Sequence, residues 1–300
     1  MPELPEVETV RRRLAPVLEG RRLADVAIAD ARLTRPADPT EVAAELLGER
    51  IAAVERRGKY LIVRFESGRA LVVHLRMTGS FLHAGRGALP DDPHRRAVVS
   101  LDDGSDVAYR DVRRFGTWLL LEPGELAAYI DARVGREPLE PGYQPRHLGE
   151  RLAGRRAPVK AVLLDQRAVA GVGNIYADEA LWRARIHPLT QASTITREQV
   201  KALHRGVRDA LRAGLRRQGS TLRDYRLPDG AQGRAQHEFK VYGRGGEPCE
   251  RCGTPIDKIR VAGRGTWYCP ACQPLDADYA ASAASRSPSR PSRSRRQSSA

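Results

Sequence analysis

All four cysteines of this 300-residue chain lie in one short segment, as two Cys-x-x-Cys pairs, Cys249/Cys252 and Cys269/Cys272. Sixteen residues separate the two pairs. Four thiolates at such a spacing meet one Zn²⁺ ion tetrahedrally, and a site with four protein ligands has no open position for water. We therefore predict one structural zinc ion, rather than free thiols or disulfides, in a small module that the metal holds folded. The lack of cysteine elsewhere fits a reducing, cytoplasmic environment.

The chain is strongly basic, with a formal net charge of +14. The last twenty residues contain five arginines and no acidic residue, and subtracting these five still leaves +9 on residues 1–280. A basic body favours a polyanionic partner such as nucleic acid, the alternative being a merely solvated charged face. Residues 276–300 are mostly Ser, Ala, Arg and Pro, which predicts a disordered tail. No segment approaches the about 18 apolar residues of a membrane span, so no membrane partner is expected.

The first 135 residues show one helical pattern followed by many strand patterns. From Leu4 to Leu18, apolar residues recur at intervals of three and four, which predicts an amphipathic helix. Short β-type runs with turn signals such as Ser67-Gly68 and Asp103-Gly104 follow, and they are typical of a sandwich. The predicted strands are Leu23–Ile28, Ile51–Arg57, Tyr60–Phe65, Ala70–Leu75, Ala97–Leu101, Val107–Tyr109 and Thr117–Leu121.

The pattern becomes helical after a segment rich in proline and glycine. Helices are predicted at Val159–Leu164, Ile175–Arg183 and Thr196–Arg217, the last with a Thr196/Gln199 capping box. The fold class is therefore α+β. We expect an N-terminal β-sandwich domain with a leading helix (1–135), a linker (136–150), a helical domain (151–236), the zinc module (237–275) and the tail (276–300).

Two reactive groups stand at the start of the chain, in Pro2 and Glu3. Removal of Met1, which a small second residue permits, would leave a secondary amine beside a carboxylate. An α-amino group has a pKa near ~8 against ~10.4 for lysine, so far more of it is free base at neutral pH. Such an amine suits imine formation at an aldehyde-like carbon, with Glu3 as its acid/base partner. The alternative is that Pro and Glu simply begin a helix.

Two further motifs suggest contacts with nucleic acid. The glycine-rich turn 170–176 (AGVGNIY) runs into a helix, and its free N–H groups would attract phosphate unless the turn only packs tightly. Met77, Arg113 and Phe115 lie in predicted loops. Apolar side chains beside an arginine suit a wedge that fills the space of an extruded base, the alternative being that Met77 and Phe115 are core residues.

Taken together, these segments resemble the bacterial formamidopyrimidine-DNA glycosylases, the oxidised-purine branch of a family that also contains endonuclease VIII. The resemblance extends in order from residue 1 to about residue 273. The matching segments are MPELPEVETV, RRGKYL, HLRMTGSF, DVRRFGTW, LLDQRAVAGVGNIYADEALWRARIHP, EFKVYGRGGEPCERCGTPI and GRGTWYCPACQ.

The resemblance implies an N-terminal β-sandwich joined to a domain with a helix–two-turn–helix element and a zinc finger, with double-stranded damaged DNA between them. It implies a monomeric, cytoplasmic enzyme of base excision repair that removes oxidised purines such as 8-oxoguanine and formamidopyrimidines. Base release would pass through a Schiff base on Pro2, and strand cleavage through β,δ-elimination. Pro2, Glu3, Lys59 and Arg264 would be catalytic. Residues resembling the family's DNA contacts are His74, Met77, His94, Arg113, Phe115, Arg155 and Asn174.

Some residues are not accounted for by the resemblance. Arg76 and Arg167 add positive charge that could strengthen DNA affinity or simply be solvated. The segment 227–237 is expected to cover the lesion, although its sequence matches no clear pattern. Two other functions remain open: an oxidised-pyrimidine glycosylase resembling endonuclease VIII, although Leu4 in PELPE favours the purine branch, and a zinc-containing DNA-binding protein without catalysis.

Overall fold

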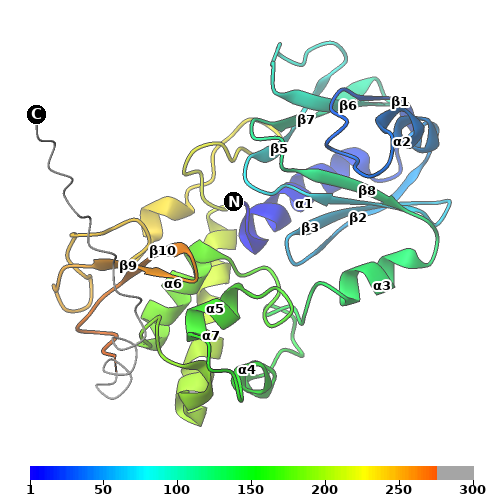
Figure 1. Ribbon diagram of the computed structural model, residues 1–300. Helices are drawn as coiled ribbons and strands as arrows, with labels where there is room; N and C mark the ends of the chain where they lie inside the picture. Colours follow the sequence, from blue (N-terminus) through cyan, green and yellow to red (C-terminus); the bar gives the residue numbers. More distant parts are fainter. Residues whose placement is uncertain (276–300) are drawn as a thin grey trace, which may run out of the picture.

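The computed structural model describes residues 1–275, so the predicted tail lies outside the described residues. Figure 1 shows two parts, a β-rich N-terminal half and a helical half that carries a small hairpin, with the N-terminus between them. The strands are β1 Leu23–Ile28, β2 Ile51–Arg57, β3 Tyr60–Phe65, β4 Ala70–His74, β5 Gly79–Gly85, β6 Arg95–Leu101, β7 Ser105–Asp111, β8 Thr117–Leu121, β9 Asp257–Val261 and β10 Arg264–Tyr268. The helices are α1 Leu4–Leu18, α2 Pro39–Leu46, α3 Glu125–Asp131, α4 Pro145–Leu152, α5 Val159–Leu164, α6 Asn174–Ala184 and α7 Arg197–Arg216, with 3₁₀ turns at Ala192–Thr194 and Ala235–Glu238.

The N-terminal half contains two antiparallel four-stranded sheets, ordered β1-β6-β7-β5 and β2-β3-β4-β8. All seven predicted strands are present, with ends shifted by one or two residues at β4, β6 and β7. Gly68 and Gly104 adopt left-handed φ values of 90° and 84° in the predicted hairpin turns, a conformation that glycine tolerates best. The sandwich prediction is therefore confirmed. Strand β5 was not predicted, because its Gly79-Ser80 start and its small residues give little β signal.

Helix α1 joins the two halves. Its apolar residues from Val7 to Leu18 pack into the core between the two sheets, whereas Leu4 at its start packs into the core of the helical half. A capping box between Glu3 and Glu6 begins the helix, with Pro5 in its first turn. Each fully buried Val or Leu contributes about 1.5–3 kcal/mol of burial free energy. The helix therefore fixes the N-terminus at the boundary between the halves.

The helical half is built on α6 and α7, which pack against each other. The Thr196 side chain accepts a hydrogen bond from the Gln199 N–H (3.2 Å), so the predicted cap is present, and the helix ends before Gly219 at φ 77°. Helix α4 begins at Pro145, inside the segment predicted as a linker. That segment is therefore helical over its last residues, because Pro145 at a first turn starts this helix instead of interrupting it.

The hairpin β9–β10 and the cysteine segment form a small unit against α6. Trp182 of α6 packs with Val241, Ile256 and two of the cysteines in one apolar cluster. Its indole N–H also donates to the Cys249 Sγ at 3.4 Å.

None of the helices in residues 1–275 combines the length and the hydrophobicity that a membrane span requires.

Candidate active site and nucleic-acid interface

The carboxylate of Glu3 lies at the N-terminus of α6. It accepts hydrogen bonds from the backbone N–H groups of Gly173 (2.7 Å), Ile175 (2.9 Å) and Tyr176 (3.4 Å), and Glu3 is only 2 % exposed. Free N–H groups and the helix dipole both favour a negative charge at this position. A Cβ on Gly173 would lie 2.4 Å from the Glu3 Cδ, so the close approach requires glycine. These three N–H groups therefore bind a protein carboxylate, and the prediction that they bind phosphate is wrong.

Glu6 makes a second set of bonds one turn along α1. It accepts hydrogen bonds from the Glu3 N–H (2.9 Å), the Tyr176 hydroxyl (2.8 Å) and the Ser220 N–H (2.7 Å). Burial, and then the nearby charge of Glu3, raises the pKa of Glu6. Through these bonds α1 is tied to α6 and to the segment that follows α7. This role of Glu6 is not predictable from the sequence, because Tyr176 and Ser220 lie more than 160 residues away.

A cavity of about 380 Å³ opens beside these two carboxylates. The wall near the chain start is formed by Met1, Pro2 and Glu6. Met77 and Arg113 come from the sandwich, and residues 220 and 222–225 come from the segment after α7. The predicted covering segment 227–237 is therefore placed too late in the chain. Leu227 is fully buried in the sandwich core, so it anchors the segment that covers the cavity.

Lys59 lies in the turn between β2 and β3 and is 4 % exposed. Burial lowers the pKa of Lys59, while Glu3 and Glu6 raise it and Arg264 lowers it further. Burial likewise lowers the pKa of the Met1 amino group. The charges of Glu3 and Glu6 raise this pKa, and those of Lys59 and Arg264 lower it. The structure thus gathers around the chain start the four residues that were predicted to be catalytic.

The turn that carries Lys59 is held by two residues that the sequence did not single out. Glu137, which follows the sandwich, accepts hydrogen bonds from the Gly58 N–H (2.5 Å) and from two nitrogens of Arg56 (2.9 and 3.0 Å). Arg56 in turn donates to Glu8 of α1 at 3.1 Å. A charged pair with so little exposure is strongly oriented by its hydrogen bonds. The sequence shows that Glu137 and Arg56 are charged, but it does not show that they are buried. Their role at the Lys59 turn could therefore not be predicted.

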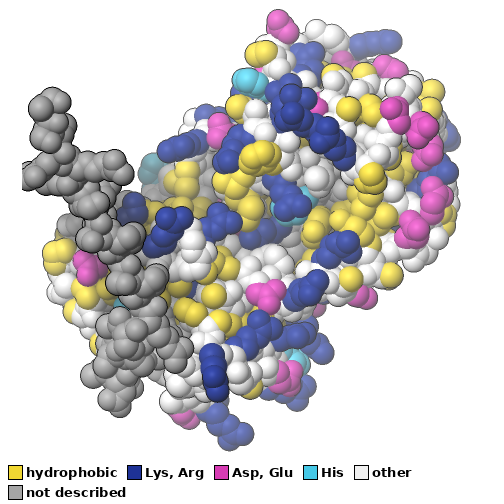
Figure 2. Space-filling model, in the orientation of Figure 1, with side chains coloured by type: hydrophobic (Ala, Val, Ile, Leu, Met, Phe, Trp, Pro, Cys, Tyr) yellow, Lys and Arg dark blue, Asp and Glu magenta, His cyan; other side chains and the backbone are white. Residues whose placement is uncertain are grey.

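The three predicted wedge residues lie together beside the cavity. Phe115 is 52 % exposed, Met77 is partly buried, and the Arg113 guanidinium lies 4.7 Å from the centre of the Phe115 ring. An exposed phenylalanine next to a cation is unusual for a core position. The alternative that Phe115 is a core residue is therefore wrong. Figure 2 shows lysine and arginine side chains on both sides of the hollow between the two halves.

The remaining predicted DNA contacts differ in the hydrogen bonds and ion pairs that their side chains already make. His74 accepts a hydrogen bond from the Arg76 N–H at its Nδ1 (2.9 Å), and burial lowers the pKa of His74 to about 3. It is therefore neutral at pH 7 with its proton on Nε2. Arg155 pairs with Asp165 (3.1 Å), and the Nδ1 of His94 lies 3.3 Å from an Arg96 nitrogen. His74 is buried, whereas His94 and Arg155 are partly exposed.

Asn174 joins α6 to the β9–β10 hairpin. Its side-chain amide donates to the Gly265 carbonyl at 2.9 Å, whereas its side-chain oxygen is buried and has no hydrogen-bond partner among the described residues. Two fully buried groups reinforce this junction: Lys160 and Asp178 form an ion pair at 2.7 Å. Lys160 also donates to the Thr266 hydroxyl (2.6 Å), and Asp178 accepts from the Trp267 N–H (3.0 Å). The exposed Arg264 at the start of β10 is thereby fixed relative to α6.

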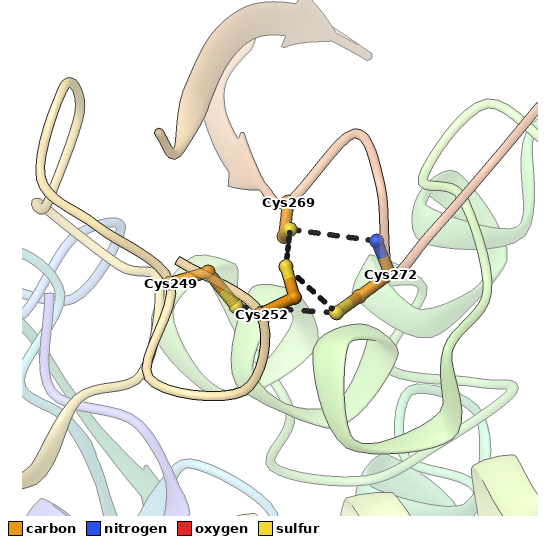
Figure 3. Close-up of side chains that lie close together, drawn as sticks. All are labelled: Cys249, Cys252, Cys269 and Cys272. Atoms are coloured by element: carbon orange, nitrogen blue, oxygen red, sulfur yellow. Dashed lines mark hydrogen bonds between the residues drawn. The ribbon is translucent and has the colours of Figure 1, made fainter. Parts of the chain in front are cut away.

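The four cysteines converge as predicted, with their sulfur atoms all within 4.8 Å of one another. Figure 3 shows them pointing toward a common centre. The recorded Sγ–Sγ distances of 3.5 and 4.0 Å are near the about 3.8 Å that a tetrahedral site with Zn–S bonds of about 2.3 Å requires. The donor set therefore fits one zinc ion held by Cys249, Cys252, Cys269 and Cys272. Four thiolates leave no position for substrate, so this zinc is structural.

Comparisons with known proteins agree with this geometry. Family models match residues 1–118 (formamidopyrimidine-DNA glycosylase N-terminal domain), 134–226 (formamidopyrimidine-DNA glycosylase H2TH domain) and 246–275 (zinc finger found in FPG and IleRS). The formamidopyrimidine-DNA glycosylase of Chloroflexus aggregans is 49 % identical over 277 residues, which cover 92 % of this chain and 99 % of that protein.

Solved structures are also similar to this chain, at lower sequence identity. A complex of a Lactococcus lactis Fpg mutant with Fapy-dG containing DNA has a TM-score of 0.85 and 36 % identity. A complex of the wild-type Lactococcus lactis protein with oxidised pyrimidine containing DNA has a TM-score of 0.84 and 36 % identity. Each similarity covers 91 % of this chain and 100 % of the other. The chain therefore belongs to the formamidopyrimidine-DNA glycosylase family.

Proposed function

We propose that this protein is a bifunctional DNA glycosylase and abasic-site lyase of base excision repair that removes oxidised purines. The observation that carries the proposal is the placement of Pro2 at the wall of the cavity, next to the fixed carboxylate of Glu3 and near the buried amine of Lys59. Met1 lines the same cavity, so its removal would expose the Pro2 nitrogen to this space. Family membership and the Fapy-dG complex of a relative support the lesion class.

The reaction begins at the sugar. The Pro2 nitrogen attacks C1′ of the damaged nucleoside, the bond from C1′ to the base breaks, and the base leaves with that electron pair and a proton from solvent. Glu3 takes the proton released by the nitrogen and delivers it to the ring oxygen as the C1′–O4′ bond breaks, which leaves an iminium ion on Pro2. The hydrogen bonds from α6 hold the Glu3 carboxylate in position for this transfer.

Strand cleavage follows from the iminium ion, because it acidifies the neighbouring C–H of the sugar. Loss of that proton expels the 3′ phosphate, and a second elimination expels the 5′ phosphate. We assign Lys59 to the first elimination, since its burial favours the neutral amine that accepts a proton. Arg264, on the hairpin that Lys160 and Asp178 hold against α6, is assigned to the second elimination.

We assign the remaining predicted residues to DNA binding. Met77, Arg113 and Phe115 would enter the duplex where the base leaves, and the other contacts would be to phosphates, made by His74, His94, Arg155 and Asn174. His74 would donate as a neutral group. The partner is double-stranded damaged DNA, and we expect a monomer in the cytoplasm. Its domains are those stated above, except that helix α4 begins within the linker. When bound, zinc would hold the cysteine segment and its hairpin in place.

Excision assays test this proposal and separate it from the alternatives. Duplexes with 8-oxoguanine opposite cytosine, with thymine glycol, and without damage should be incubated with the full chain. We expect cleavage of the 8-oxoguanine strand and a covalent adduct on borohydride reduction. Preferential cleavage of the thymine-glycol strand would favour the oxidised-pyrimidine alternative. Binding without cleavage of any duplex, and without an adduct to abasic DNA, would show a non-catalytic DNA-binding protein.

A further inference from the structure

An aspartate outside the cavity is attached to the loop that carries the wedge. Asp30, just after β1, is 4 % exposed and accepts two hydrogen bonds from the Arg114 guanidinium, at Nε (2.6 Å) and Nη2 (2.7 Å). Arg114 stands between Arg113 and Phe115 in the chain. Two parallel bonds of this kind fix the orientation of both partners as well as their distance. Asp30 therefore constrains the wedge loop from 84 residues away in the sequence.

The loop needs such a constraint. Arg114 has φ 58°, a left-handed conformation that costs a residue with a side chain about 1–2 kcal/mol. This conformation lets Arg114 reach Asp30 while its two neighbours lie over each other on the DNA-facing side. The other support is local: Asp111 accepts from the Gly116 N–H (2.7 Å) and the Arg113 N–H (3.2 Å), and it bonds the Thr78 hydroxyl. These bonds hold the two ends of the loop, and the Asp30 pair holds its middle.

A wedge acts only if it is rigid. Unstacking a base step costs a few kcal/mol, and a side chain that yields on contact cannot supply that energy. Phe115 is half exposed and gains little from packing, so its position depends on the backbone beneath it. We propose that Asp30 is a positioning residue for base extrusion, acting through Arg114 on Arg113 and Phe115. This inference rests on the proposed function, because it assigns a part of the glycosylase step.

The test compares two substrates that differ in their need for the wedge. Excision of 8-oxoguanine from a duplex requires extrusion, whereas cleavage of single-stranded abasic DNA does not. For Asp30→Ala we expect about tenfold slower duplex excision at single turnover, as for loss of a charge-assisted hydrogen-bonded pair. Single-stranded cleavage should stay within about twofold, the range of a surface substitution. Asp25→Ala is the matched control and should leave both reactions unchanged, because Asp25 is exposed on β1 and its side chain makes no hydrogen bond or ion pair within residues 1–275.

Two more variants separate positioning from folding. Arg114→Gly relieves the left-handed backbone but removes the pair, so it should slow duplex excision as much as Asp30→Ala, and the double variant should be no slower than either. Asp30→Asn keeps an acceptor and should be intermediate. Fluorescence of 2-aminopurine beside the lesion should report less unstacking in Asp30→Ala at saturating protein. Equal losses on both substrates, or normal duplex excision by Asp30→Ala, would overturn the inference. Failure of the unaltered protein to cleave either substrate would instead refute the proposed function.

Discussion

The reaction centre and the zinc module are both held by convergent ligands, but they are assembled in opposite ways. The zinc ligands come from one segment of the chain, Cys249 to Cys272. The Glu3 carboxylate instead meets N–H groups 170 and more residues away, and Glu6 reaches Ser220 over 214 residues. The module therefore depends on a metal and the reaction centre on the packing of the whole molecule. This difference predicts that the two regions fail differently when they are altered.

Loss of zinc should have the largest effect and should be confined to one region. Cys249→Ala removes one thiolate, and structural zinc sites contribute about 10–16 kcal/mol of apparent binding free energy. We expect loss of zinc, faster hydrogen exchange in β9–β10, and loss of DNA binding. Hydrogen exchange in β2–β4 should be unchanged, since no cysteine contacts the sandwich among the described residues. An unchanged zinc content of one ion per chain would exclude the four-thiolate site.

Glu3→Gln should show the reverse pattern, with chemistry lost and most of the fold kept. A positioned acid/base group contributes about 10²- to 10⁴-fold to rate, so excision should fall by that range. The amide would also face an N–H donor of α6, which costs about 1–3 kcal/mol of stability. Glu45→Gln is the control for thermal unfolding and excision, because Glu45 is exposed on α2 and its side chain has no hydrogen bond or ion pair in the described part of the chain. Excision by Glu3→Gln at the unaltered rate would refute the role of Glu3.

The buried Lys160–Asp178 pair joins the two regions, so its loss should affect both. Lys160→Met leaves Asp178 buried without its cation, which costs about 3–5 kcal/mol. Unfolding in urea should show this loss, and the second elimination should slow because the Arg264 hairpin loosens. Lys160→Met combined with Asp178→Leu removes both charges and should recover most of the stability. Lys201→Met, on the exposed face of α7, is the control. No recovery in the double variant would show that the pair acts through contacts other than charge.

Acid should destabilise the sandwich side through His74. Its folded pKa of about 3 lies below the ordinary 6.5, so below pH 6.5 the unfolded chain binds the proton that the folded protein excludes. The part of the unfolding free energy that depends on neutral His74 is complete above pH 6.5 and is lost as the pH falls toward 3. About 1 kcal/mol of it is lost between pH 6.5 and pH 5.5. His74→Gln should therefore show a shallower loss of unfolding free energy between pH 6.5 and 5.5. The exposed His237→Gln is the control, and equal pH slopes in both variants would contradict the prediction.

The smallest effect is expected at Arg76, which has φ 51° and an exposed side chain beside His74. Arg76→Gly removes the strain of the left-handed φ but raises the conformational entropy of the unfolded chain. The net gain in unfolding free energy should be about 0–1 kcal/mol. Loss of one phosphate contact would lower the salt slope of DNA affinity by about 0.9. Arg76→Ala should lower the slope equally without the gain in stability. An unchanged slope in both variants would show that Arg76 is only solvated.

The parts of the molecule that depend on local sequence were predicted well. The zinc ligands, the Thr196 cap and all seven predicted strands are present, because spacing and alternation fix them within a few residues. Pro2 and Glu3 were predicted from their own chemistry, and Lys59 and Arg264 from the resemblance. The proximity of the four residues is a property of the structure.

What was missed depends on contacts distant in the sequence. The N–H groups of the turn 170–176 were available to phosphate in principle, and only the fold shows that Glu3 occupies three of them. The same is true of Glu137 below Lys59 and of Asp30 beside Arg114. Helix α4 was missed because a short helix that starts at a proline resembles a linker. Each omission concerns a charged residue or a short element whose partner lies elsewhere in the chain.

Peptide mapping of the borohydride-trapped complex tests the central claim most directly. The full chain should be reduced on 8-oxoguanine duplex, digested with protease and nuclease, and sequenced by mass spectrometry. We expect the sugar remnant on the nitrogen of Pro2, in a chain that has lost Met1. A remnant on Lys59, or a fully active protein that retains Met1, would contradict the proposal that the chain's own N-terminal imino group is the nucleophile.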